Sequence, residues 1–380
     1  MRVTLRSASL ATCKAGLLCG VVLLASCGGN SSSGSTAHTP SVVGSVVPNS
    51  SYELDAFDIQ GNYAYVLGDN GNQGASGSST AAQFYVVNIA NPASMAVVST
   101  TSITGFISLG QSGIRVVGNY VYLVSCTGTA STNLLQIYNV SNPTAPAFVG
   151  SIQVPLYANG LWVSGQYAYV ISYVGVSSIS ALTIVNISNP ASPTVVGSTN
   201  TGTAGVNVAD IKVVGNYAYV AGQSDLQSPT QPSENSQLLV FDVSNPASPY
   251  LFSSLPVAHS PQGLAIEGNY WYETFYDQFS LNIYNISNPS SLPLVGTAAL
   301  VGTCKPQDVT VVGTTAYVAC YTNSSIGIVD VSNPASPVVN GYIALPATSY
   351  PIFLESEGSY LYSISNTTGG MLTAINIGGA

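Results

Sequence analysis

Charged residues are scarce in this chain. Lys, Arg, Asp and Glu make up 6% of the 380 residues, against about 25% in an ordinary globular protein. Three of the six basic residues, Arg2, Arg6 and Lys14, lie at the very start of the chain. The remainder has three basic residues against fifteen acidic ones, which excludes a basic surface for nucleic acid or for anionic lipid. The 46% share of hydrophobic residues excludes a disordered polyelectrolyte.

Long apolar runs are absent as well, because a helix that crosses a bilayer needs about 20 apolar residues. The apolar stretch from Ala15 to Ala25 follows the basic residues and has the length of the apolar region of a secretory signal. It ends in Leu24-Ala25-Ser26-Cys27, which resembles the bacterial lipobox, where small residues precede a cysteine that becomes lipidated. We therefore predict a lipoprotein signal peptide over residues 1–26 and acylation, with palmitate, of Cys27. The alternative is an ordinary signal peptide with an incidental cysteine.

The residues after Cys27 indicate where such an anchor would lie. In the lipoproteins that this segment resembles, an Asp directly after the modified cysteine favours the inner membrane, whereas this chain has Gly28. We therefore expect an exported protein that is anchored in the bacterial outer membrane and contacts the membrane only through its lipid. Residues 27–39 combine this cysteine with a Gly- and Ser-rich stretch, which predicts a flexible linker.

From residue 40 onward the chain repeats itself. A Gly-Asn-Tyr-x-Tyr-Val motif, degraded in some copies, recurs at intervals of 45 to 57 residues. All but the last copy are followed by Asn or Asp, Ile or Val, Ser or Ala, and then Asn-Pro, as at Asn88. Gly-Asn predicts a hairpin because both residues tolerate a positive φ, and Asn-Pro predicts a second turn. The motif glycines are Gly61, Gly118, Gly165, Gly215, Gly268, Gly313 and Gly358.

Each unit predicts four short antiparallel strands, the arrangement of a β-propeller blade. The seventh unit ends after its third strand, and residues 40–45 repeat the fourth-strand pattern of residues 193–198. We therefore predict one all-β domain over residues 40–380. It is a seven-bladed β-propeller of four-stranded antiparallel blades, in which the N-terminal strand completes the last blade. Such closure removes two free sheet edges, which are sites of aggregation.

The third strands carry a sequence that resembles a known repeat. Residues 239–243 read Leu-Val-Phe-Asp-Val, and residues 326–331 read Ile-Gly-Ile-Val-Asp-Val. These segments resemble the LVIVD repeat of bacterial and archaeal surface proteins, and the resemblance extends over about residues 40–380. It implies a surface-associated propeller. It assigns no functional residue, because the residues that recur are structural.

Candidate binding residues lie where the inner strands are expected to begin, around one mouth of the central channel. The long variable loops share this face, and loops on a rigid scaffold often carry function. Hydrogen-bonding groups next to aromatic rings suit a neutral polar ligand such as a sugar. Small residues at the equivalent positions of other blades have a packing explanation, since strands crowd near the axis. The candidates are Glu53, Tyr157, Asn207, Asp210, His259, Lys305, Asp308 and Tyr350.

Catalytic and metal chemistry have little support in the sequence. His259 is the only histidine after the linker, and a catalytic role would require convergence with Glu53, Asp210 or Asp308. The alternative is a histidine on the rim. One histidine with scattered carboxylates is a poor zinc site, and the segment Asp69–Asn72 lacks the terminal Glu of a calcium loop. We predict no metal and no cofactor, and the common nucleotide and hydrolase motifs are absent.

The six cysteines fall into three groups. Cys13 and Cys19 lie in the predicted signal peptide, and Cys27 directly follows it. Cys304 precedes the first strand of the sixth unit, and Cys320 ends its second, so the two are expected to be neighbours. We predict a Cys304–Cys320 disulfide, as suits an exported protein. Cys126 has no evident partner and is either buried and inert or an exposed thiol.

Together these features predict a membrane-tethered surface or periplasmic binding module without catalytic activity. It would engage an envelope or cell-surface protein, or a polysaccharide, through its loops, and we expect a monomer. Two alternatives stay open. One is a hydrolase- or lyase-like enzyme at the channel mouth, and the other is a purely structural component of the envelope.

Overall fold

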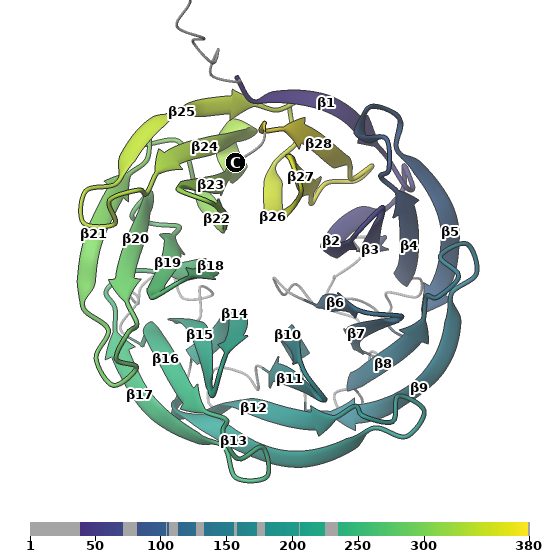
Figure 1. Ribbon diagram of the computed structural model, residues 1–380, viewed down its shortest axis with the longest axis horizontal. Coiled ribbons are helices and arrows are strands. Elements are labelled where there is room, and N and C mark those ends of the chain that lie inside the picture. The colour runs from purple at the N-terminus through teal and green to yellow at the C-terminus, as the bar shows by residue number, and fades with distance from the viewer. Residues whose placement is uncertain are drawn as a thin grey trace, which may run out of the picture. The chain divides into compact units, whose positions relative to one another are not determined.

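Figure 1 shows a computed structural model of the chain, which divides into two units, Met1–Ala37 and His38–Ala380. The structure describes residues 39–70, 82–103, 105, 113–126, 133–155, 158–172, 179–204, 206–224 and 235–378. The predicted signal peptide and Cys27 lie outside the described residues. Within the described part, no helix is long and apolar enough to cross a membrane.

The described residues form seven sheets of four antiparallel strands, arranged as blades around a central axis (Figure 1). The inner strands lie nearest the axis and the fourth strands form the rim. The predicted all-β, seven-bladed propeller is therefore confirmed. The two helical segments in the described part are single 3₁₀ turns, η1 (Pro92–Ser94) and η2 (Tyr321–Asn323).

The first two strands of every blade form a tight hairpin. The inner strands are β2 (Glu53–Gln60), β6 (Ile114–Val117), β10 (Ala158–Ser164), β14 (Val206–Val214), β18 (Pro261–Glu267), β22 (Pro306–Val312) and β26 (Pro351–Glu357). The second strands are β3 (Tyr63–Asp69), β7 (Tyr120–Cys126), β11 (Tyr167–Ser172), β15 (Tyr217–Ser224), β19 (Tyr270–Phe275), β23 (Thr315–Cys320) and β27 (Tyr360–Ser365).

The outer half of every blade is a second hairpin. The third strands are β4 (Ala82–Asn88), β8 (Asn133–Asn139), β12 (Ile179–Asn186), β16 (Gln237–Asp242), β20 (Ser280–Asn285), β24 (Ser325–Asp330) and β28 (Leu372–Asn376). The fourth strands are β5 (Ala96–Ile103), β9 (Ala147–Val154), β13 (Thr194–Ala204), β17 (Tyr250–Pro256), β21 (Leu294–Ala299), β25 (Val338–Ala344) and, in the last blade, β1 (Ser41–Val46).

The ring closes through its N-terminal strand, as predicted. β1 pairs with β28, and Ser41 lies opposite Asn376 in the register. The next blade packs closely on β1, because a Cβ added to Gly44 would lie 2.2 Å from the carbonyl oxygen of Pro92. The turn η1 of the first blade therefore packs against the strand that closes the ring.

The turn after each inner strand depends on its glycine alone. The seven motif glycines have φ between 58 and 60°. The residue that follows each of them does not have a positive φ, although Asn would tolerate one. A positive φ at the first central residue only is the pattern of a type II′ turn, which matches the twist of the flanking strands. The second position therefore tolerates Gln166 or Thr314 as well as Asn.

The apolar core lies between neighbouring blades. The second tyrosine of each repeat is buried there by the strands of two blades, and its neighbour two residues earlier is half-buried. Burial raises the pKa of these phenols, because the charged form would lose its hydration. The buried tyrosines are Tyr65, Tyr122, Tyr169, Tyr219, Tyr272, Tyr317 and Tyr362.

Candidate functional site

We call the region along the axis the channel and its two ends the mouths, and we name the mouths by the connections around them. At the loop face the inner strands begin and the second strands pass to the third. At the hairpin face the inner strands end in the type II′ turns. Because the inner strands all run in the same direction, the residues before each strand meet at the loop face.

Three tyrosines and a lysine gather at the loop face, contributed by blades five, six and seven. We call Tyr276, Lys305, Tyr321 and Tyr350 the tyrosine cluster. Lys305 Nζ donates a hydrogen bond of 3.1 Å to the hydroxyl oxygen of Tyr276 and lies 4.7 Å from the centre of that ring. The rings of Tyr321 and Tyr350 lie 5.2 Å apart at an angle of 38°. All four side chains are half-buried, so each keeps part of its surface for a ligand.

Tyr321 is coupled electrostatically to the other members of this cluster and to Glu53. Burial raises the pKa of its phenol, and the neighbouring Tyr276, Tyr350 and Glu53 raise that pKa further. Lys305 acts in the opposite direction because its positive charge favours the phenolate. Glu53, Lys305 and Tyr350 were predicted from sequence, and the structure brings all three around Tyr321.

A disulfide fixes two members of the cluster. Cys304 and Cys320 are joined, with an S–S distance of 2.01 Å, and both are fully buried. The predicted disulfide is thus present in the structure. Lys305 and Tyr321 directly follow these cysteines, and the Tyr321 amide donates to the Lys305 carbonyl at 3.0 Å. The cross-link therefore holds the lysine beside the tyrosine.

Unusual backbone conformations also collect at this face. Among the described residues, the non-glycine residues with positive φ are Phe279, Ser324, Thr348 and Tyr350. All four lie in connections at the loop face, and Tyr350 itself has φ of 40°. Such conformations cost of order 1 kcal/mol or more and tend to occur at functional sites.

His259 lies on the rim and does not meet the predicted carboxylates. Its Nδ1 is 3.2 Å from Asp277 Oδ2, and both side chains are about 40% exposed. Asp277 also accepts a hydrogen bond from the Ser260 amide at 2.9 Å, so it holds the turn before β18. In the described part of the chain, His259 has no hydrogen bond or ion pair with Glu53, Asp210 or Asp308. The convergence that catalysis would require is not seen.

Asp210 and Asp308 fasten neighbouring inner strands together. The two oxygens of Asp308 accept the amides of Val309 at 2.8 Å and of Leu354, in the next blade, at 2.9 Å. Asp210 makes the same pair of contacts, to Ile211 at 2.7 Å and to Leu264 of the next blade at 3.3 Å. Inner strands have one edge without a strand partner, and these carboxylates satisfy part of it.

The other predicted positions contribute less to a site. Asn207 lies in β14 opposite Gln223 and is half-buried. Tyr157 lies outside the described residues, as does the second half of the segment Asp69–Asn72. Cys126 is the last residue of β7. No group of three or more His, Cys, Asp or Glu side chains in the described ranges could hold a metal ion.

The hairpin face carries a set of charged residues that sequence reasoning missed. Three residues before the motif glycine, successive blades present Asp58, Arg115, Trp162, Lys212, Ala265, Thr310 and Glu355. We call Asp58, Arg115, Trp162, Lys212 and Glu355 the charged ring. Arg115 Cζ lies 4.8 Å and Lys212 Nζ 4.6 Å from the centre of the Trp162 ring. Arg115 Nη1 is 3.9 Å from Glu355 Oε1.

A sequence signal for this ring did exist. Only three basic residues follow the predicted signal peptide, and two of them, Arg115 and Lys212, occupy the same position of the repeat. One of the two tryptophans, Trp162, holds that position in the blade between them. Comparing the repeats position by position would have revealed a ring of chemistry at the far end of the inner strands.

The fold has many solved counterparts. A protein from Lactobacillus plantarum is 10% identical, with a TM-score of 0.61, over 80% of this chain and 89% of that one. The periplasmic gluconolactonase of Pseudomonas aeruginosa is 12% identical, with a TM-score of 0.59, over 78% and 85% of the two chains. At such identities the similarity establishes the fold alone. No functionally curated protein matches the sequence.

The repeat itself identifies the family. Six segments match the LVIVD repeat, namely residues 111–154, 157–201, 205–227, 233–256, 260–299 and 305–344. They lie in blades two to six, and the first and last blades have the same strand order without a match. Their third strands include the residues on which the resemblance was based. The chain belongs to the LVIVD repeat family.

Proposed function

We propose that this propeller is a non-catalytic binding module that takes a neutral glycan at its loop face. The observation that carries the proposal is the tyrosine cluster, in which residues from three blades meet beside the channel. Phenol rings offer an apolar face to the C–H groups of a sugar and a hydroxyl that can donate or accept. Glu53 and Lys305 place one charge of each sign at the cluster, so it does not favour a strongly charged ligand.

Rigidity of the cluster supports the same function. The disulfide and the Tyr321–Lys305 backbone hydrogen bond fix the spacing of two contributors. A site whose groups are held in place before binding loses less conformational entropy when the ligand arrives. The ligand could be a polysaccharide, or a surface protein that exposes hydroxyl groups, since both offer the hydroxyls that this cluster would bind.

Glycan binding is tested with the purified full-length chain and immobilised neutral oligosaccharides, such as cellotetraose and maltotetraose. We expect Tyr350→Ala to weaken binding about tenfold, or about 1.4 kcal/mol, because it removes one ring of the Tyr321–Tyr350 pair. The matched control is Tyr250→Ala on the outer strand β17, where the tyrosine is 50% exposed and away from the channel. Equal affinities of the two variants, or no binding by the wild type, would refute the proposal.

A hydrolase at the channel mouth is the competing function. The Pseudomonas aeruginosa counterpart is named as a gluconolactonase, so glucono-1,5-lactone is a suitable first substrate. We expect no turnover above the uncatalysed rate. Turnover that is lost in His259→Ala would favour the enzyme, because His259 is the only described side chain near this mouth with an unperturbed pKa near neutrality.

We further propose that the chain is exported and anchored in the outer membrane through acylated Cys27. The order of the basic residues, apolar stretch and lipobox-like segment supports this, and so does the disulfide, since disulfides persist in oxidising compartments. Labelling of cells with an alkyne analogue of palmitate should mark the wild type but not Cys27→Ser. Equal labelling of both would contradict the anchor.

A further inference from the structure

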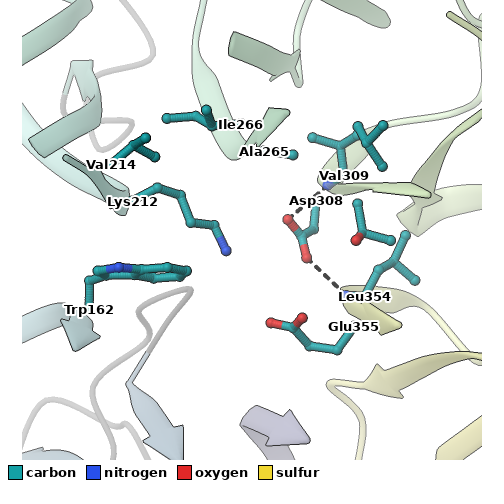
Figure 2. Close-up of a pocket in the computed structure, with 11 residues that line it drawn as sticks. Trp162, Lys212, Val214, Ala265, Ile266, Asp308, Val309, Leu354 and Glu355 are labelled. Atoms are coloured by element: carbon teal, nitrogen blue, oxygen red, sulfur yellow. Dashed lines mark hydrogen bonds between the residues drawn. The ribbon is translucent and has the colours of Figure 1, made fainter. Parts of the chain in front are cut away.

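A pocket opens from the channel at the hairpin face, on the side opposite to the tyrosine cluster. It has a volume of about 160 Å³, enough for a small organic molecule. Trp162 and Lys212 line one side, and Asp308 and Glu355 line the other (Figure 2). The rest of the lining is mainly apolar and includes Val214, Ala265, Ile266, Val309 and Leu354.

Lys212 brings an ammonium group into this pocket. Its side chain reaches over Trp162 toward the carboxylate side (Figure 2), and Nζ lies 4.6 Å from the centre of the indole ring. Over the described residues, this half-buried ammonium donates no hydrogen bond and is within 4.0 Å of no carboxylate. An ammonium has three donors that need acceptors. Arg115, from the blade on the other side of Trp162, adds a second positive charge nearby.

Glu355 supplies the corresponding negative charge across the pocket. Its only charged contact in the described part is with Arg115 at 3.9 Å, which is too long for a hydrogen bond. The Glu355 side chain keeps 30% of its surface exposed. Asp308 differs, because both of its oxygens accept backbone amides. Glu355 is thus the carboxylate with oxygens free to accept from a ligand.

The protonation of Asp308 keeps the pocket from being strongly acidic. Burial raises the pKa of Asp308 to about 8, with the charge of Asp210 adding to the shift and that of Lys212 opposing it. At neutral pH this carboxyl is therefore mainly uncharged, so the pocket holds the ammonium of Lys212 and the carboxylate of Glu355 as its principal charges. Glu355 would repel a ligand that carries only a negative charge, and Lys212 would repel a ligand that carries only a positive charge. Only a ligand that carries both charges satisfies both side chains.

We propose that this pocket binds a small zwitterion, an α-amino acid with an apolar side chain. Its carboxylate would lie at Lys212, its ammonium at Glu355, and its side chain against Ile266 and Val309. The proposal does not depend on glycan binding, because the two sites share no residue and lie at opposite mouths of the channel.

The experiment compares three ligands that differ by one charged group. These are L-leucine, 4-methylpentanoate, which lacks the amine, and 3-methylbutylamine, which lacks the carboxylate. Binding to the full-length wild type is measured by calorimetry. We expect L-leucine to bind at least about tenfold more tightly than either analogue, because each analogue can pair with only one of the two charged side chains, Lys212 or Glu355. This comparison needs no variant, so it does not depend on how a substitution affects folding.

Variants then locate the site. Lys212→Met and Glu355→Gln should each weaken L-leucine binding about tenfold or more. Lys305→Met, at the loop face, is the matched control and should bind as the wild type does. The proposal is overturned if either analogue binds as well as L-leucine, if no ligand binds at millimolar concentration, or if Lys305→Met has the same effect as Lys212→Met.

Discussion

At the loop face the backbone changes from blade to blade, whereas at the hairpin face the backbone repeats and only the side chains change. The described non-glycine residues with positive φ all belong to the loop face, and a disulfide there joins the residues that precede Lys305 and Tyr321. At the hairpin face, seven glycines share one turn conformation, with φ of 58 to 60°. The charged ring rests on that regular base.

This difference shows two ways in which a propeller can build a site. Irregular connections bring together side chains from different positions of the repeat, such as Tyr276 and Tyr350. A regular strand end presents one position from every blade, so that a single substitution in each repeat can create a ring such as Arg115, Trp162 and Lys212. A site built from irregular connections depends on cross-links and strained backbone. A site built from one repeated strand position depends on the fold alone.

The largest effect that we expect is a fall in the free energy of unfolding as the pH rises, caused by the buried carboxyl groups of the channel. Burial raises the pKa of Asp308 to about 8, well above the roughly 3.9 of an unfolded Asp. The folded state therefore holds a proton that the unfolded state has released. The contribution to stability is fully present below about pH 4 and is lost as the pH rises through about 8. For one such proton the free energy of unfolding falls by about 1.4 kcal/mol per pH unit in this range.

Denaturant unfolding at a series of pH values tests this. Burial also raises the pKa of Asp55 and of Glu273, so the wild type has several contributors. Between about pH 5 and 7, the free energy of unfolding of Asp308→Asn should fall less steeply with pH than that of the wild type. The expected difference is that of one proton, about 1.4 kcal/mol per pH unit. The matched control is Asp330→Asn, since Asn takes this turn position in several blades and Asp330 has its pKa lowered by hydrogen bonds from Ser332. Equal slopes for the two variants would show that Asp308 is ionised in the fold.

Loss of the disulfide should act on the loop face and leave the hairpin face in place. Cys304→Ser combined with Cys320→Ser opens a link between residues 16 apart, which should lower the free energy of unfolding by about 3 kcal/mol. Glycan binding should weaken, because Lys305 and Tyr321 lose their common anchor, while L-leucine binding stays unchanged. Cys126→Ser is the control in denaturant unfolding and calorimetry. If the double variant bound both the glycan and L-leucine more weakly, the two mouths would not be independent.

The sequence predicted the fold well because turn residues mark every strand end. Glycine at Gly61 and its six counterparts, and Asn-Pro after the third strand, recur with little change, and the N-terminal fourth-strand pattern predicted the closure by β1. The sequence predicted the hairpin but left its turn type open, because tolerance of a positive φ at Asn does not mean that Asn adopts it. Blade count and strand order do not depend on that detail.

The sites could be predicted only in part. The prediction at the start of the inner strands included Glu53, Lys305 and Tyr350. It left out Tyr276 and Tyr321, although each of them directly follows a second strand, eight residues after the motif glycine of its blade. Asp210 and Asp308 were predicted as binding residues, yet their oxygens accept amides of adjacent strands, a contact between blades that a linear pattern does not reveal. The charged ring was detectable, but only by comparing positions at the other end of the strand.

The smallest effect tests whether the regularity of the hairpin face depends on backbone conformation alone. A Cβ added to Gly165 would meet nothing within 4 Å, and its φ is 58°. Gly165→Ala should therefore destabilise the protein by about 1–2 kcal/mol through the strain of positive φ in an L-residue. Gly302, before the inner strand of blade six, also has open space around it but no positive φ. Gly302→Ala should change stability by less than about 0.5 kcal/mol. Thermal unfolding of both variants measures the difference, and a neutral Gly165→Ala would show that the turn glycines are not what keeps this face regular.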